Sequence, residues 1–497
     1  MKLNRRNFLI KSSCALSMTA LATQARHFGL MAALANTKSG LIASAPPADY
    51  RALVCVFLAG GNDGNNMIIP NHNDQNVSNY AAYSGIRAAQ GLAIPQNQLL
   101  SITVPRVNGL TYGLHPGFGD QTGLTPPGGA PNRGIHELWA QGKLAAVTNV
   151  GNLVAPMTRQ QYQQNAIQKP YQLFSHSDQI AQQQAGLAGR QSNTGFGGRL
   201  ADRTQADNNP TALIPMITSI AGTPLFTNGQ TTAPLAIASG NVPLNQVLAL
   251  QGYGSDAVST ARRNALNDLR GLDRNLDLIR AASQITDGAF QASSALNVAV
   301  NTTVAFPNTA LGNQLKQVAR MIKQRQPLQV NRQIFFCSLG GFDTHTGQVS
   351  SATGGQNGLL LQLSQAMRAF YDEMGAQGAQ DNVTLFTLSD FGRTLSPAGN
   401  GTGAVGSDHA WGNHALVMGG AVRGGDFYGT NTSNGTPFPT LSLNGPEDTD
   451  SRGRWIPTSS VDQYAATLAR WYGLPDDQMP IVFPNISNFA SSNLGFM

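Results

Sequence analysis

The chain has 497 residues, which is long enough for one large enzyme core with an insertion or for two to three domains. Only 12% of its residues are charged, while glycine and proline number 54 and 26, and this composition excludes a coiled coil and an acidic disordered chain. The formal net charge of +6 does not indicate a nucleic-acid partner, because five basic residues lie in the first 35 positions with no acidic residue among them.

Residues 1–35 are predicted to be a targeting signal. Paired arginines open the run Asn4-Arg5-Arg6-Asn7-Phe8-Leu9-Ile10-Lys11, and a mildly apolar stretch leads to small residues at Thr23-Gln24-Ala25 or Ala33-Leu34-Ala35. This order resembles a twin-arginine export signal more than a chance arginine pair before a surface helix. We therefore expect the twin-arginine translocase as a partner for export, and the periplasm or the cell surface as the destination.

The rest of the chain is expected to contain no membrane span, since no later stretch reaches the roughly 18 consecutive apolar residues that a span requires. Cys14 lies in the signal, and Cys55 and Cys337 each lie inside an apolar run. We expect these two to be buried free thiols rather than a disulfide.

After a linker at 36–50, alternating strand and helix patterns predict an α/β core. Continuous apolar runs of strand length occur at 52–58, 144–147, 334–337, 383–388 and 416–418. Apolar residues recur at helical spacing over 311–322 and 359–374. Runs that are apolar on both faces fit a parallel sheet covered by helices. The pattern predicts a doubly wound, mostly parallel sheet with helices on both faces.

The middle of the chain breaks this pattern. Residues 205–305 are rich in Thr, Asn, Gly and Pro and then become more charged and helical. We predict that they form an inserted cap over one end of the sheet, while 51–204 and 306–497 form the core.

Acidic residues and histidines follow the predicted strands at the end where an open parallel sheet binds its ligands. These residues are Asp63, Asp343, His345, Asp390, Asp408 and His409. Carboxylates gathered at one rim would repel one another unless a cation joins them, and mixed carboxylate and imidazole ligands suit zinc, manganese or iron. The alternative is that these aspartates cap the helices that follow the strands.

Several motifs make the chain resemble a known bacterial family. They are Gly60-Gly61-Asn62-Asp63-Gly64, Gly341-Phe342-Asp343-Thr344-His345, Ser389-Asp390-Phe391-Gly392-Arg393-Thr394, Ser407-Asp408-His409, Gly419-Gly420-Ala421-Val422-Arg423-Gly424-Gly425 and Leu468-Ala469-Arg470-Trp471. The chain resembles the exported family catalogued as "domain of unknown function 1501", which is placed in the alkaline phosphatase and sulfatase superfamily. The resemblance implies an alkaline phosphatase-like fold.

The resemblance also implies a metal site that holds one or two divalent ions, zinc or manganese. Its ligands would be Asp63, Asp343, His345, Asp390 and His409, with Asp408 either a ligand or a residue that orients His409. In the superfamily, two metals polarise a phosphate or sulfate ester and stabilise an alkoxide nucleophile. This chain departs from the superfamily where Phe391 follows Asp390, since a histidine is common there, and from the family, which usually has Glu at that aspartate.

Two hydroxyls are candidate nucleophiles. Thr158 precedes Arg159 in a segment that looks like the superfamily's nucleophile turn, whereas Ser175 belongs to a Ser-His dipeptide typical of the family, and we favour Ser175 slightly. Arg159 or Arg393 could bind the substrate anion, although Arg393 could instead pair with Asp390 at the start of a helix.

Two functions are therefore expected as alternatives. The first is an exported hydrolase of phosphate or sulfate esters that acts on a small-molecule or polymer substrate. The second is a non-catalytic binding or assembly protein of the cell envelope that keeps the same fold and has lost the second metal, which Phe391 favours.

Overall fold

The structure is a computed structural model that describes residues 49–120, 133–247, 256–271, 277–349, 351, 354–399 and 405–497. The predicted signal at 1–35 and most of the predicted linker at 36–50 lie outside the described residues. Within the described ranges, no helix combines the length and the apolar character that crossing a membrane would require.

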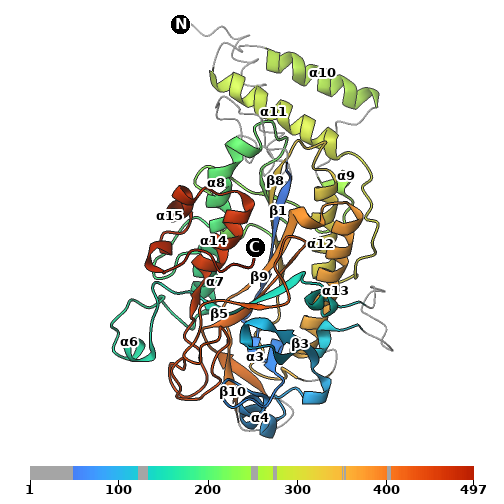
Figure 1. The fold of residues 1–497 in the computed structure, drawn as a ribbon. Helices are drawn as coiled ribbons and strands as arrows, with labels where there is room; N and C mark the ends of the chain where they lie inside the picture. Colours follow the sequence, from blue (N-terminus) through green and yellow to red (C-terminus); the bar gives the residue numbers. More distant parts are fainter. Residues whose placement is uncertain are drawn as a thin grey trace.

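One large sheet organises the chain (Figure 1). Its strands are β1 (Arg51–Leu58), β5 (Leu144–Gly151), β6 (Ile217–Ser219), β7 (Leu235–Ala236), β8 (Arg332–Leu339), β9 (Val383–Ser389), β12 (Asn413–Gly419), β13 (Phe427–Tyr428) and β14 (Ser459–Ser460). The order is β13-β5-β12-β9-β1-β8-β6-β7, and β14 also pairs with β5. Only β12 runs antiparallel to its described neighbours, so the predicted mostly parallel sheet is confirmed.

Helices cover both faces of this sheet, because its strands are apolar on both sides. Alternate residues of β1 enter two different hydrophobic clusters, with Val54 and Val56 in one and Leu53 and Phe57 in the other. Helices α12 (Ala310–Lys323) and α13 (Gly355–Ala376) pack into the first cluster. Helices α8 (Phe196–Asn208), α14 (Val461–Tyr472) and α15 (Met479–Val482) pack into the second, and Figure 1 shows the two groups on opposite sides of the strands.

The two described cysteines are free and buried, as predicted. Cys55 lies in the cluster on one face of the sheet and Cys337 in the cluster on the other, so their side chains point away from each other. Burial raises the pKa of both thiols.

The carboxyl ends of the central strands meet at one edge. Leu58 of β1 is in register with Leu339 of β8 and with Ser389 of β9, and these are the last residues of their strands. β5 ends at the same edge and β12 begins there, since Asn413 pairs with Val150. We call this edge the rim.

Smaller elements surround the rim in the lower part of Figure 1. They are α3 (Gly64–Met67), α4 (Tyr80–Arg87), α6 (Arg159–Gln163), α7 (His176–Ala185), the hairpin of β10 (Arg393–Ala398) with β11 (Gly406–His409), and the sheet of β2 (Ile68–Pro70), β4 (Leu110–Leu114) and β3 (Leu100–Val104). α5 (Glu137–Ala140) leads into β5.

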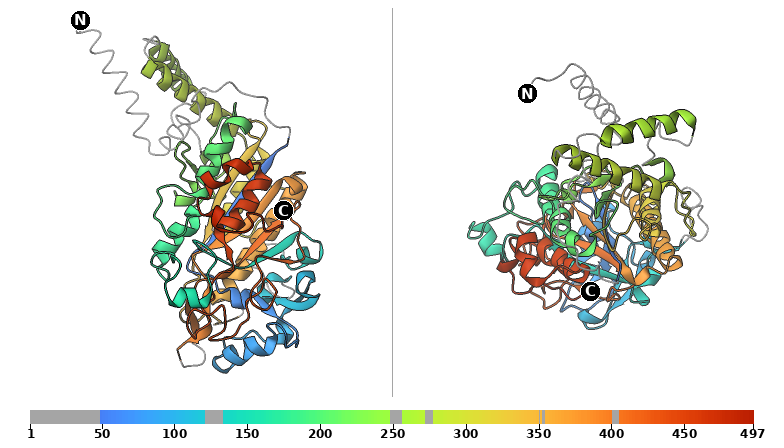
Figure 2. Two further views of the ribbon diagram at one scale, coloured as in Figure 1. Left: turned by 60° about the vertical axis from the view of Figure 1, so that its left-hand side comes forward. Right: turned by 90° about the horizontal axis from the view of Figure 1, so that it is seen from above.

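The region predicted to be a cap is divided between the sheet and a projecting pair of helices. Strands β6 and β7 fall within 205–305 yet belong to the large sheet. Helix α9 (Leu244–Val247) follows them, and α10 (Ala257–Gly271) and α11 (Asp277–Leu296) project beyond the end of the sheet opposite the rim (Figures 1 and 2). The two long helices therefore do not cover the rim.

Candidate metal centre

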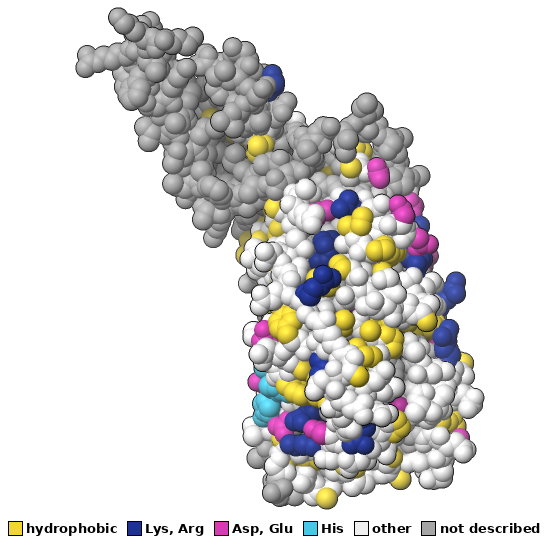
Figure 3. All heavy atoms as spheres, turned by 90° about the vertical axis from the view of Figure 1, so that its left-hand side faces the viewer, with side chains coloured by type: hydrophobic (Ala, Val, Ile, Leu, Met, Phe, Trp, Pro, Cys, Tyr) yellow, Lys and Arg dark blue, Asp and Glu magenta, His cyan; other side chains and the backbone are white. Residues whose placement is uncertain are grey.

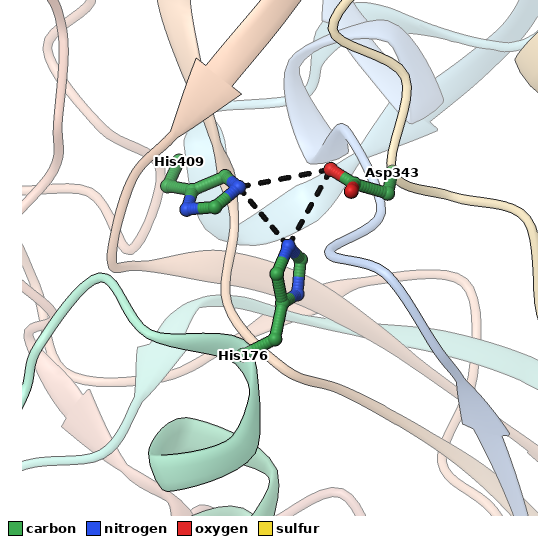
Figure 4. Close-up of side chains that lie close together, drawn as sticks. All are labelled: His176, Asp343 and His409. Atoms are coloured by element: carbon green, nitrogen blue, oxygen red, sulfur yellow. Dashed lines mark hydrogen bonds and ion pairs between the residues drawn. The ribbon is translucent and has the colours of Figure 1, made fainter.

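Four side chains from three segments converge at the rim. His176 is the first residue of α7, Asp343 and His345 lie in the loop after β8, and His409 ends β11. We call these four residues the rim cluster. Figure 4 shows His176, Asp343 and His409 pointing toward one another, and these three lie close enough together to hold a metal ion.

The facing atoms of the rim cluster are three Nε2 nitrogens and one carboxylate oxygen. The Nε2 of His409 lies 3.0 Å from that of His176 and 2.9 Å from that of His345. The Oδ1 of Asp343 lies 3.4, 3.1 and 3.6 Å from the Nε2 atoms of His176, His345 and His409.

The other ring nitrogen of each histidine faces an acceptor. Nδ1 of His176 lies 2.7 Å from Oδ2 of Asp390, and Nδ1 of His345 lies 3.1 Å from Oδ1 of Asp408. Nδ1 of His409 lies 2.7 Å from the carbonyl oxygen of Phe174, which can only accept a hydrogen bond. In neutral rings these contacts place the proton on Nδ1, so the Nε2 lone pairs of His176 and His345 both face that of His409. A cation between them removes that repulsion, and such carboxylate–histidine pairs orient ligands in metal sites.

The spacing of the donors fits a small divalent ion. Ligand atoms of a tetrahedral zinc site, about 2.0–2.1 Å from the metal, lie roughly 3.3 Å from one another. The Nε2 of His409 and the Oδ1 of Asp343 lie 2.9 to 3.6 Å from each other and from the Nε2 atoms of His176 and His345. The ligand atoms of His176, Asp343 and His409 all lie within 4.8 Å of one another. A donor set of imidazole nitrogens with one carboxylate oxygen also suits zinc, whereas calcium and magnesium favour oxygen ligands alone.

The rim cluster is accessible from solvent. The side chains of Asp343 and His345 are 50% and 42% exposed, whereas those of His176 and His409 are 29% and 23% exposed. Figure 3 shows histidine side chains reaching the surface beside a mixed group of basic and acidic side chains. A ligand could therefore approach the cluster without prior opening of the core.

The cluster sits where three loops approach closely. Gly60 after β1 has φ +113°, and a Cβ there would lie 2.4 Å from the backbone nitrogen of Asp343. A Cβ at Gly406 would lie 1.9 Å from the carbonyl oxygen of Thr344. Only glycine permits these contacts, so the two glycines fix how near the β1 and β11 segments come to the β8 loop.

Burial and charge shift the pKa values of three groups at the site. Burial lowers the pKa of His409 and raises that of Asp390, although the His176 contact and the Gly60 amide oppose the rise at Asp390. Burial also acts to raise the pKa of Asp343, but the hydrogen bond and charge of Arg393 outweigh it and the net pKa is lowered. Asp343 is thus held as a carboxylate.

Arg393 is fully buried and holds the loops of the rim together. It donates to the backbone carbonyls of Gly60, Gly61, Phe342 and Ser407 and lies 2.5 Å from Oδ1 of Asp343. Two expectations for Arg393 were wrong. It begins strand β10 instead of a helix, and it pairs with Asp343 instead of Asp390.

The structure brings together most, but not all, of the residues predicted as metal ligands. Asp343, His345 and His409 converge as described, whereas Asp390 contacts the far nitrogen of His176. Asp63 is placed elsewhere, since it caps α3 and its carboxylate pairs with Arg87.

Sequence reasoning did not assign His176 as a ligand. The signal that could have suggested it was the Ser-His dipeptide at 175–176. Leu173 and Phe174, just before it, pack against a small hydrophobic cluster that contains Trp411, two residues after His409. This packing brings the start of α7 to the rim.

The two hydroxyl candidates differ in their surroundings. Thr158 is exposed and forms a capping box with Gln161 at the start of α6, while Arg159 bonds to the carbonyls of Asn444 and Asp450. Ser175 precedes α7 without capping it, and its Oγ donates to Oδ2 of Asp178 over 2.6 Å.

Phe391 lies against the imidazoles. Its ring centroid is 4.7 Å from those of both His176 and His409. Phe391 thus supplies an apolar wall to the cluster.

Residues 130–438 match the family model described as "Protein of unknown function (DUF1501)". The chain belongs to this family. No protein with a curated description matches it. Among solved structures, the PsFucS1 sulfatase from Pseudoalteromonas sp. is similar at 11% identity and a TM-score of 0.29, over 86% of this chain and 68% of that one. The protein Ps i-CgsB, solved with k-i-k-neocarrahexaose, is similar at 10% identity and a TM-score of 0.28, over 88% and 77% of the two chains.

Proposed function

We propose that this DUF1501 protein is an exported, metal-dependent hydrolase of phosphate or sulfate esters. The observation that carries the proposal is the convergence of three Nε2 lone pairs and one carboxylate oxygen at a solvent-accessible rim. His176, His345, His409 and Asp343 would hold the ion, zinc or manganese, while Asp390, Asp408 and the Phe174 carbonyl keep the imidazoles oriented. The bound ion would polarise an ester oxygen of the substrate.

The resemblance to the alkaline phosphatase superfamily supports the same proposal. A mostly parallel sheet with functional residues beyond its carboxyl ends is compatible with that fold. Asp343, His345, Asp390 and His409 occur in the order that the resemblance implies.

Ser175 is the nucleophile in this proposal. Its hydroxyl donates to the half-buried carboxylate of Asp178, and the next residue is a member of the rim cluster. Ser175 Oγ would bond to phosphorus or sulfur while its proton passes to Asp178, the bond from phosphorus or sulfur to the alcohol oxygen breaks, and the departing alkoxide takes a proton from solvent. Water would then attack the seryl ester and lose a proton to solvent, and the released Ser175 Oγ would take back the proton from Asp178.

A specific observation favours the second function, a non-catalytic, metal-bound binding or assembly protein of the cell envelope. Both arginines considered for anion binding donate to protein acceptors, Arg159 to a surface loop and Arg393 to the loops of the rim. Phe391 adds an apolar wall where an imidazole would be expected for a second ion. The two functions differ in whether esters are hydrolysed.

The location is part of the proposal. Export by the twin-arginine translocase to the periplasm or cell surface rests on Arg5 and Arg6 and the apolar stretch after them. Replacing both arginines by lysine should keep the chain in the cytoplasm, as measured by fractionation. Continued export of that variant would contradict the assignment.

The test of activity is hydrolysis of phosphate and sulfate monoesters by the purified chain with added zinc or manganese. We expect turnover by the wild type and a loss of at least about 100-fold in His345→Ala. His136→Ala is the matched control, because this histidine bonds to the Ser101 carbonyl outside the rim cluster. Bound metal without turnover of any ester would favour the binding protein.

A further inference from the structure

The buried carboxylate of Asp63 has no acceptor capacity left for a metal ion. Its Oδ1 accepts from the backbone nitrogen and the side-chain amide of Asn65 and from Arg87, and its Oδ2 accepts from Arg87 and from Gln348. A carboxylate offers about four lone-pair sites, and these five hydrogen bonds occupy them. Asp63 and Arg87 are both 0% exposed at their side chains.

The N–H donors of Arg87 are likewise all used in hydrogen bonds. Its Nη1 and Nη2 reach the two oxygens of Asp63 at 2.6 and 3.2 Å. The remaining donors go to Asn66 and to the carbonyls of Thr394 and Leu395. The guanidinium therefore supplies the positive charge that this carboxylate requires, and it does so as a covalent part of α4.

Asp343, at the same rim, is by contrast a carboxylate that is available to a metal ion. It also has an arginine partner, Arg393, but its side chain is half exposed and its Oδ1 faces three imidazole nitrogens. The contrast separates two acidic positions that the sequence alone treats alike.

From these contacts we infer that the rim holds a single metal ion and that Arg87 is a built-in cation for Asp63, which takes no part in metal binding. The inference rests on the metal binding contained in the proposed function and fixes its stoichiometry. The ligands are then three imidazoles and one carboxylate, a nitrogen-rich set suited to one zinc-like ion.

The experiment counts metal ions per folded chain, by elemental mass spectrometry on protein exported through its own signal and by native mass spectrometry. We expect one ion in the wild type and one in Asp63→Asn combined with Arg87→Gln, which removes both buried charges together and so leaves neither unpaired. His176→Ala is the matched variant in the rim cluster and should hold none.

The outcomes separate this inference from the function on which it rests. Two ions in the wild type would overturn the inference while leaving metal-dependent chemistry in place, and this count requires no variant to fold. Loss of the ion from the folded double variant would also overturn it, because Asp63 would then be needed for binding. A metal-free wild type would contradict the inference and the proposed function together.

Discussion

The Nε2 atoms of His345 and His409 lie 2.9 Å apart although the Nδ1 atom of each ring faces a hydrogen-bond acceptor. In neutral rings both Nε2 atoms carry lone pairs, so this contact is repulsive without a cation. A proton or a metal ion would relieve it, and Asp343 adds a carboxylate oxygen 3.1 Å from His345.

Removing one imidazole from the rim cluster should abolish stable metal binding. His176→Ala and His345→Ala each delete one of the four facing donors. We expect zinc affinity, measured by calorimetry, to fall at least about 100-fold, since three ligands remain and lone-pair repulsion is relieved without the ion. His136→Ala should bind as the wild type does, and equal affinity in all variants would place the metal elsewhere.

The carboxylate of Asp408, which contacts His345, should also affect the affinity for zinc. Asp408 contacts Nδ1 of His345 over 3.1 Å and lies 2.8 Å from Arg452. Asp408→Asn should lower zinc affinity by about 10–100-fold, because the ring loses the partner that fixes its tautomer. Asp450→Asn is the control, as this aspartate pairs with Arg454 instead of a histidine. Equal affinity for the two variants would mean that Asp408 does not orient His345.

The two hydroxyl candidates can be separated by one pair of variants. Ser175→Ala should reduce ester hydrolysis by at least about 1,000-fold while leaving bound metal unchanged. Thr158→Ala should keep its activity and lose about 1 kcal/mol of stability, since Thr158 caps α6. The measurements are kcat on the best ester and denaturant unfolding. The opposite pattern would make Thr158 the nucleophile.

Replacing the buried arginine of the rim should destabilise the whole edge. Arg393→Met leaves the Asp343 charge without its partner and four carbonyls without their donor. We expect a loss of about 3–5 kcal/mol in the free energy of unfolding, chiefly because the four carbonyls lose a buried donor. Arg470→Met, at an exposed pair with Asp476, should change it by less than about 1 kcal/mol. A similar small change at Arg393 would show that the loops hold together without it.

Stability should depend on pH through Asp462. Burial raises the pKa of this fully buried aspartate to about 7 from 3.8, against opposing backbone hydrogen bonds and the charge of Arg199. Because the folded pKa is the higher one, the associated stability is complete below about pH 4 and is lost as the pH rises through 7.

The variant Asp462→Asn removes this titration. Its advantage over the wild type in urea unfolding should be roughly 2–3 kcal/mol greater at pH 8 than at pH 5. A pH-independent difference between the two proteins would mean that Asp462 does not titrate in this range.

Much of the fold could be predicted from the sequence because its strands are recognisable from local runs of apolar residues. The runs at 52–58, 144–147, 334–337, 383–388 and 416–418 all form strands of the large sheet. Strands buried on both faces need no distant partner to be recognised, since continuous apolar character is itself the signal. The direction of the strands then predicted that Asp343 and His345 would lie at the rim.

The position of residues 205–305 in the fold was harder to predict from the sequence. Composition marked 205–305 as different, but β6 and β7 within it complete one side of the sheet. These two strands have three and two residues, too few for a periodic pattern, and their place is set by pairing with β8 and with each other.

The sequence by itself determined the layered α/β core and the presence of acids and histidines beyond its strands, because both follow from local patterns and strand direction. Only the tertiary structure decided which of them face one another. His176 reaches His409 across 233 positions through packing that no local pattern encodes. Asp63 does not face the rim cluster, because its carboxylate pairs with Arg87, which lies 24 residues later in α4. A charge takes its role from its nearest partner in space, and that partner is fixed only when the chain has packed.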